Sequence, residues 1–300
     1  MNTKRLRRRN AGEIIFECFL YGFFLLFTVT MIYPFWDIIM LSFANPATAN
    51  RLSFRLWNDT WNFSSYKYLF SNKGIALAYF NTIVRTVLPT AGFLVLTMVA
   101  AYPLSKRDLP GRTFITVFFL ITMFFSGGLI PSFLLIRNLG LVNTRWALIV
   151  PGLFGAYSMV LMRNYLQAQD PALEEAAFID GAGFGTILWK IVVPLCKPLL
   201  VTLALWTAVG HWNDWFGAMI YVRPKELKVL QQLLREMMLE ITADVTDIQR
   251  FNAQTAVKSQ VSGPTVEAAM LLITIGPILA IYPFAQKYFV KGIMVGSLKG

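Results

Sequence analysis

The chain has 300 residues, of which 56% are hydrophobic and only 14% are charged. Soluble domains carry about 25% charged residues, so this composition excludes a disordered chain and argues against an ordinary soluble enzyme. Two cysteines and one histidine are too few for a disulfide framework or a zinc site with four protein ligands. In so apolar a chain, the formal net charge of +11 indicates basic anchoring at one membrane face rather than nucleic-acid binding.

The hydrophobic residues are concentrated in six blocks, each close to the length of about 20 residues that a helix needs to cross a bilayer. The first block follows a tail rich in Lys and Arg. We interpret it as an uncleaved helix, because it is too long for the apolar region of a signal peptide. The blocks predict an all-α, polytopic membrane protein with six transmembrane helices at residues 14–35, 79–104, 114–136, 146–162, 199–222 and 266–289.

The basic tail, residues 1–13, sets the predicted orientation, since Lys and Arg close to the first span favour the cytoplasmic side. We therefore expect both termini, including residues 291–300, to be cytoplasmic and the protein to lie in a bacterial cell membrane. On this topology the connection at residues 166–197 is cytoplasmic. The two long segments at residues 44–78 and 223–264 lie outside.

Each outer segment is expected to contain a helix. In the first, four aromatic residues favour a helix at the membrane interface: Trp57, Trp61, Tyr66 and Tyr68. In the second, apolar residues at helical spacing predict a helix over residues 229–241, as part of a cap on the span ends. Basic residues outnumber acidic ones in these segments, which suits an acidic saccharide, a binding-protein surface or simple solvation.

The cytoplasmic connection contains the most specific pattern of the chain. Asp170 is a good N-cap, and Pro171 suits the first helical position. Glu174 and Glu175 follow in the first turn, where the helix dipole favours acidic residues, and Gly181 and Gly183 are expected to end the helix. The pattern predicts a short, self-capped helix, followed by a second helical piece over residues 186–192 that stops at Pro194.

Apolar residues on this short helix provide a small surface for a groove on another protein: Leu173, Ala176, Ala177 and Phe178. The alternative is an interfacial helix that lies on lipid. A short helix flanked by glycine-containing joints can move as a rigid lever.

The same stretch resembles the EAA loop of ABC importer permeases. The family's pattern is E-A-A, three residues, G, nine residues, I, one residue and L-P. This sequence has the same spacing at Glu175-Ala176-Ala177, Gly181, Ile191 and Val193-Pro194. The one departure is Val193, where leucine is usual. Further stretches are similar to the carbohydrate-uptake branch, above all to permeases for oligosaccharides or polysaccharide fragments: Ala101–Ser105, Ser126–Pro131, Gly140–Ala147, Gly210–Asn213 and residues 291–300.

The resemblance implies the type I ABC importer permease fold and a division of labour. Such a permease pairs with a second, related permease, binds two cytoplasmic ATPase subunits, and receives its oligosaccharide from an extracellular or periplasmic solute-binding protein. This chain would bind no cofactor and be no enzyme, since ATP and Mg would be held by the ATPases; it contains no P-loop sequence. The residues that the resemblance assigns to ATPase coupling are Leu173, Glu175, Ala176, Ala177, Asp180, Gly181, Ile191 and Pro194.

The fifth span contains the candidate residues for the sugar pathway: Trp206, His211, Trp212, Asn213 and Trp215. Aromatic faces suit the apolar faces of sugar rings, and an amide can bind hydroxyl groups. Trp206, Gly210, Asn213 and Gly217 are expected to share one stripe of a continuous helix. The alternatives are that the tryptophans pack against lipid or a partner permease and that His211 is an interior histidine.

Five polar residues are predicted in the outer half of the spans: Asp37, Asn81, Arg85, Asp214 and Glu267. We expect an ion pair of Arg85 with Asp214 or Glu267, and no metal site. The rival to an ABC permease is an ion-coupled secondary transporter of sugars, which predicts inverted repeats that the sequence does not display.

Overall fold

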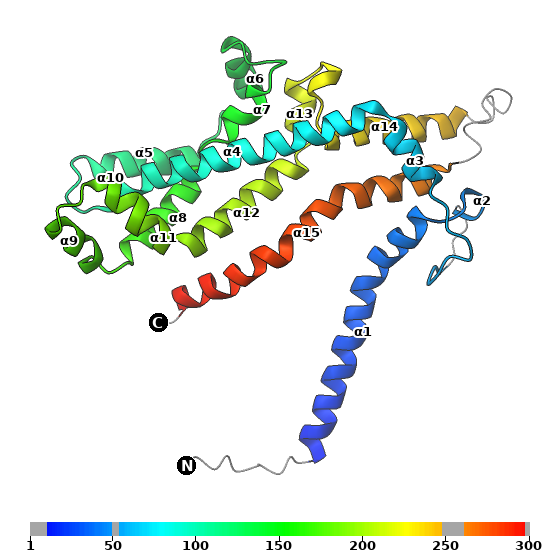
Figure 1. Ribbon diagram of the computed structural model, residues 1–300, viewed down its shortest axis with the longest axis horizontal. Coiled ribbons are helices and arrows are strands. Elements are labelled where there is room, and N and C mark those ends of the chain that lie inside the picture. Colours follow the sequence, from blue (N-terminus) through cyan, green and yellow to red (C-terminus); the bar gives the residue numbers. More distant parts are fainter. Residues whose placement is uncertain (1–10, 50–53, 248–260, 298–300) are drawn as a thin grey trace. The chain divides into compact units, whose positions relative to one another are not determined.

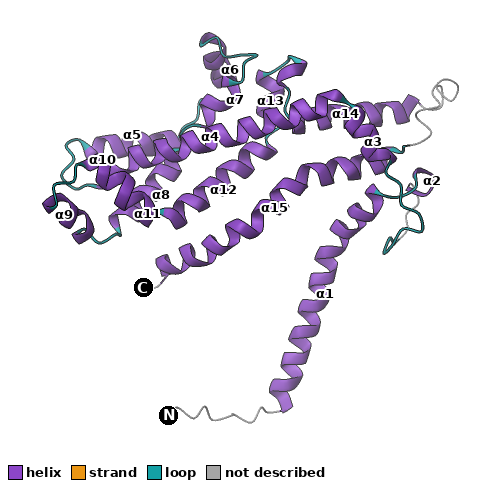
Figure 2. Ribbon diagram, viewed as in Figure 1, coloured by secondary structure: helices purple, strands orange, loops and turns teal. Residues whose placement is uncertain are grey.

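The computed structural model describes residues 11–49, 54–247 and 261–297. All regular elements in these residues are helices, and none of them is a strand (Figure 2), so the predicted all-α class is confirmed. The chain divides into two units. The first unit comprises residues 1–71 and 241–273, and the second comprises residues 72–240 and 274–300.

Three helices are long and apolar enough to cross a membrane. They are residues Gly12–Ser42 of α1 (Ala11–Ser42), α4 (Lys73–Ser105) and residues Gly263–Pro283 of α15 (Gly263–Ser297).

Three further candidates are pairs of helices that are bent at a short break. In the first pair, α5 (Arg112–Phe124) and α6 (Leu129–Asn138) are bent by 115°. In the second pair, residues Trp146–Gly152, which contain α7 (Trp146–Ile149), are bent by 40° relative to α8 (Ala156–Gln167). In the third pair, residues Phe184–Leu195 are bent by 78° relative to α12 (Lys197–Asn213). With each bent pair counted as one span, the described residues contain up to 6 spans.

The third expected span, residues 114–136, is divided by its glycines. α5 ends at Phe124 and α6 begins at Leu129. Between them Gly128 has φ 84°, a conformation that glycine adopts without steric cost. The 13 residues of α5 rise about 20 Å, which is less than the thickness of about 30 Å of a bilayer core, so α5 alone is too short to cross.

The fifth expected span, residues 199–222, is also interrupted. α12 ends at Asn213 and α13 (Phe216–Tyr221) follows after two residues. The Oδ1 atom of Asp214 accepts a hydrogen bond from the backbone N–H of Gly217 at 3.0 Å and so caps α13. The expectation that Asn213 and Gly217 share one helical stripe is therefore wrong.

The core of the second unit is built around α4. This helix packs against α8 and α12, and α5 packs against α8 (Figure 1). Buried side chains from α4 and α8 meet there, including Met98, Tyr102, Met159 and Met162, together with Leu203 from α12. Figure 1 shows α9 (Ala172–Ile179) and α10 (Phe184–Ile187) near one end of α4, and α14 (Leu230–Asp247) near its other end.

The helix predicted over residues 229–241 is confirmed as α14. Its first turn is attached to α4, because the backbone N–H of Leu230 donates to the buried Oγ1 atom of Thr82 at 2.8 Å. The residue before Thr82 on α4, Asn81, donates from its side chain to the carbonyl oxygens of Glu226 and Lys228 at 2.8 and 3.0 Å. The buried polar residues of α4 therefore fix the start of this segment.

The first unit contains α1, α2 (Pro46–Ala49), α3 (Ser64–Ser71) and the start of α15. Ser65 donates a buried hydrogen bond to Thr265 at 2.9 Å and thereby joins α3 to α15. α3 begins after Asn62, whose side chain accepts from the backbone N–H of Ser64 at 2.7 Å. Trp57 and Trp61 precede this cap, so the expectation that they share a helix with Tyr66 and Tyr68 is wrong.

Candidate functional site: the coupling loop and the α12 break

The first half of the predicted coupling loop, residues 166–197, contains the short helix α9. Asp170 accepts a hydrogen bond from the backbone N–H of Ala172 at 3.0 Å, which satisfies a free donor at the helix start. Glu174 and Glu175 lie in the first turn, where the helix dipole favours acidic side chains. The predicted helix and its cap at Asp170 are confirmed.

The end of α9 is a glycine-dependent Schellman motif. Gly181 has φ +82°, a left-handed conformation that a residue with a Cβ atom rarely adopts. The N–H of Ala182 donates to the carbonyl of Ala177 at 2.9 Å, and the N–H of Gly181 donates to that of Phe178 at 3.0 Å. The predicted end of the helix at Gly181 is therefore confirmed, with a defined hydrogen-bond pattern.

Most of the predicted coupling residues of α9 and its end are exposed in this chain: Leu173, Glu175, Ala176, Asp180 and Gly181. Ala177 is buried, and it faces the protein's own core. Ile179, which is not among the predicted coupling residues, is 87% exposed. It continues the three-residue spacing of Leu173 and Ala176, and this spacing was the signal that could have identified it.

The second half of the loop is built into the core. Ile187, Leu188 and Val192 are buried, and Ile191 is half-buried against the same cluster, whereas Pro194 is exposed. The expected stop at Pro194 is wrong. α10 continues through a π turn, Leu188–Val192, into α11 (Val193–Leu195). The π turn lies just before Pro194, which has no N–H to donate. The helix therefore continues past this proline with wider hydrogen-bond spacing instead of ending there.

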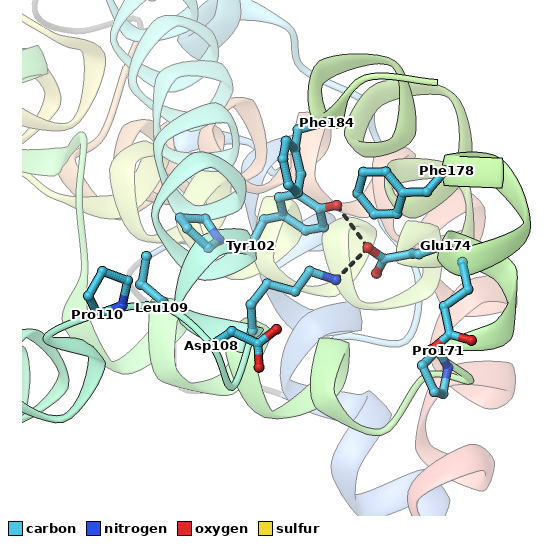
Figure 3. Close-up of a pocket in the computed structure, with 11 residues that line it drawn as sticks. Tyr102, Asp108, Leu109, Pro110, Pro171, Glu174, Phe178 and Phe184 are labelled. Atoms are coloured by element: carbon cyan, nitrogen blue, oxygen red, sulfur yellow. Dashed lines mark hydrogen bonds and ion pairs between the residues drawn. The ribbon is translucent and has the colours of Figure 1, made fainter. Parts of the chain in front are cut away.

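A pocket of about 730 Å³ lies between α9, α10 and the turn from α4 to α5 (Figure 3). Its wall includes Phe178 and Phe184, whose rings meet edge to face with centroids 5.0 Å apart. Figure 3 shows the carboxylate of Glu174 directed toward Tyr102. Glu174 accepts a hydrogen bond from the Tyr102 hydroxyl at 2.8 Å and forms an ion pair with Lys106. No sequence pattern predicts this cluster, because its members are 68 and 72 residues apart.

Trp212, one of the predicted pathway residues, is held inside its own chain. It is 7% exposed, and its Nε1–H donates to the carbonyl of Thr274 on α15 at 3.0 Å. Its ring meets Tyr79 of α4 edge to face, with centroids 5.8 Å apart. These contacts support a packing role.

His211 and Trp215 also contact other parts of the chain. A Cβ atom on Gly152 would lie 2.3 Å from Cε1 of His211, so the imidazole lies against that glycine's backbone. The guanidinium of Arg235 on α14 lies 3.8 Å from the centroid of the Trp215 ring, a cation–π contact. Of the five predicted pathway residues, only Trp206 and Asn213 are exposed.

The break after α12 is bound to α4 by a charged contact. Arg85 donates to the carboxylate and to the backbone carbonyl of Asp214. This confirms the predicted ion pair and selects Asp214 as its acid. Across the described ranges, no group of three His, Cys, Asp or Glu residues is arranged to hold a metal ion.

Comparison with known proteins agrees with this architecture. Protein LplC of Bacillus subtilis (strain 168) is 39% identical over 269 residues, which cover 90% of each chain. The polygalacturonan/rhamnogalacturonan transport system permease protein YtcP of the same strain is 35% identical over 286 residues, covering 95% of this chain and 99% of YtcP.

A crystal structure of a bacterial ABC transporter involved in the import of the acidic polysaccharide alginate contains a similar chain. The TM-score is 0.84 at 30% sequence identity, and the match covers 94% of this chain and 99% of that one. Residues 74–295 match the family described as the inner membrane component of binding-protein-dependent transport systems. Because this match extends from α4 into α15, the chain belongs to that family, the membrane permeases of ABC importers.

Proposed function

We propose that this chain is one of two permease subunits in an ATP-driven importer of oligosaccharides or polysaccharide fragments. The names of two relatives support the substrate class, since YtcP is a polygalacturonan/rhamnogalacturonan permease and the similar solved structure is an alginate importer. Two ATPase subunits would bind on the cytoplasmic side, which also holds both termini, and a solute-binding protein would bind outside.

The observation that carries this proposal is the form of α9. Both of its ends are capped by local hydrogen bonds, and its outer face exposes Leu173 and Ile179 beside the acidic Glu175 and Asp180. Burying a large aliphatic side chain in a partner's groove stabilises a complex by about 1.5–3 kcal/mol. Two such residues would contribute about 3–6 kcal/mol to keeping α9 in the groove while the ATPases move.

The coupling proposal is tested in proteoliposomes that contain the chain with its permease partner and ATPases. Glu175→Lys reverses a charge on the exposed face of α9, and Ile179→Asp removes its most exposed apolar side chain. We expect both to abolish uptake and reduce the amount of ATPase that co-purifies, while insertion into the membrane is unchanged. Asp59→Lys, at an exposed acid of the first unit, is the matched control. Normal uptake by both α9 variants would reject the coupling role.

The energy source is tested in the same vesicles. Uptake should require ATP inside the compartment that holds the ATPases, and it should persist when ion gradients are collapsed. Uptake driven by an ion gradient without ATP would instead indicate a secondary transporter.

The substrate class is tested by competition among neutral and acidic oligosaccharides and monosaccharides. We expect oligosaccharides to compete and monosaccharides to fail. Trp206 and Asn213 are the proposed pathway residues, because they alone of the five candidates keep exposed side chains.

A further inference from the structure

We propose that Glu174 is a positioning residue that ties the coupling helix α9 to the end of α4, so that a displacement of α9 moves α4. The inference rests on the proposed coupling function of α9. It assigns a separate task to an acidic residue that lies next to the EAA stretch but outside it.

The contacts of Glu174 come from two groups on the last turn of α4 and the residue after it. The same oxygen, Oε2, accepts a hydrogen bond from the hydroxyl of Tyr102 at 2.8 Å and pairs with the ammonium group of Lys106. That ammonium group also lies 4.7 Å from the centroid of the Tyr102 ring. The three side chains thus form one interlocked cluster.

This cluster is partly withdrawn from water. The side chain of Glu174 is 18% exposed and that of Lys106 is 35% exposed. A hydrogen bond to an ionised group is about twice as strong as a neutral one, and reduced solvent screening strengthens it further. The contact is therefore stronger than an ordinary surface ion pair, which contributes about 0–1 kcal/mol.

The neighbouring acid has a different environment. Glu175 is exposed, and no ion pair of its side chain is found in the described part of the chain. Successive residues on an α-helix point about 100° apart, so Glu174 faces its own chain while Glu175 faces outward. One acid is therefore placed to hold α9 and the other to meet a partner.

The rest of α9 is weakly attached. Ala177 is its buried residue, and Phe178 adds a ring contact to Phe184. Beyond the helix end, Gly181 forms a left-handed joint. Without the Glu174 cluster, a force on α9 would bend this joint instead of moving the spans. The cluster closes a second connection between α9 and the membrane helices.

α4 extends that connection to a distant point in the second unit. Its 33 residues correspond to about 50 Å of helix, and Tyr102 and Arg85 are about 25 Å apart along it. Arg85 binds Asp214 at the break that follows α12. A shift of the α9 end of α4 is therefore applied directly to the junction of α12 and α13.

The experiment compares transport with ATP hydrolysis in reconstituted importer. Glu174→Gln and Lys106→Gln each remove one charge, and Tyr102→Phe removes only the hydroxyl. The exchange Glu174→Lys/Lys106→Glu restores an opposite pair with its polarity reversed. The control is Glu226→Gln, an exposed acid in the connection between α13 and α14.

We expect Glu174→Gln and Lys106→Gln to lower sugar transported per ATP hydrolysed about tenfold, the size expected for one charge-assisted contact. Tyr102→Phe should lower it less, and the exchange should recover most of the loss. ATPase subunits should co-purify with every variant, because the outward face of α9 is intact.

Three results would overturn the proposal. The first is an unchanged ratio of sugar transported to ATP hydrolysed in Glu174→Gln, and the second is failure of the exchange to recover this ratio. The third is loss of ATPase binding in Glu174→Gln, since it would place Glu174 in the interface with the ATPase. If the ATPases fail to co-purify with the unaltered chain, the proposed function itself fails, which is a distinguishable result.

Discussion

Arg85 of α4 binds Asp214 twice, once through the carboxylate and once through the backbone carbonyl at the end of α12. The side chain of Arg85 is 5% exposed and that of Asp214 is 40% exposed. The contact thus neutralises a buried cation and also satisfies a carbonyl that the end of the helix leaves without an intrahelical partner.

This difference in exposure predicts an asymmetric response to mutation. Asp214→Asn keeps an oxygen to cap α13 but leaves the buried guanidinium without a counter-charge, which costs about 3–5 kcal/mol. Arg85→Met leaves a half-exposed carboxylate and should cost less. Thermal unfolding of the purified complex measures both, with Asp59→Asn as a surface control. A larger destabilisation by Arg85→Met would contradict this assignment.

A second prediction concerns the joint at Gly181. A Cβ atom there meets nothing within 4 Å, so Gly181→Ala changes only the backbone strain, by about 1–2 kcal/mol. Amide hydrogen exchange at the end of α9 should accelerate and uptake should fall. Gly185→Ala is the matched control, because its Cβ atom also meets nothing but lies within α10, where alanine is favoured. Equal effects at the two glycines would rule out a special role for the left-handed conformation.

A third prediction separates packing from sugar contact at two tryptophans. Trp212→Phe loses the hydrogen bond to Thr274, which is worth about 1 kcal/mol, and should lower the melting temperature. Trp206→Phe removes an exposed indole and should leave the melting temperature unchanged while it alters transport kinetics. Melting curves and concentration-dependent uptake distinguish the two. A change of stability in Trp206→Phe alone would reverse the assignments.

A fourth prediction uses the close approach of His211 to Gly152. Gly152→Ala places a Cβ atom 2.3 Å from the imidazole and should destabilise the protein, because the ring has to move. His211→Ala should relieve the clash, so the double variant should be more stable than Gly152→Ala alone. Such non-additivity is expected between residues in contact. Strictly additive effects would show that the two residues do not interact. Gly210→Ala, where the added atom meets nothing, serves as the control.

The sequence predicts a structural feature correctly where the interactions that determine the feature join residues close together in the chain. Asp170 and Gly181 specify α9 through bonds to residues within five positions, so its location and ends could be predicted. The two candidate acids for Arg85 could be named because charged residues are rare in spans. The choice of Asp214 required the structure.

The features that sequence reasoning missed depend on distant partners. Glu174 meets groups 68 and 72 positions away, and no local pattern signals that contact. The break after Asn213 has neither proline nor glycine at its start, so the sequence of the fifth apolar block predicts one continuous helix. Trp212 looked available for sugar because its neighbours on α4 and α15 were unknown.

The bend between α5 and α6 bears on which part of the permease surface is in contact with water. Residues 125–128 lie outside regular helix. The hydrocarbon core of a bilayer contains no hydrogen-bond partner for backbone groups that are not paired within a helix. Irregular backbone at membrane depth is tolerated only beside other protein or an aqueous cavity. We therefore expect the Ser126-Gly127-Gly128 bend, which is exposed in this chain, to face a neighbouring subunit or water and not lipid.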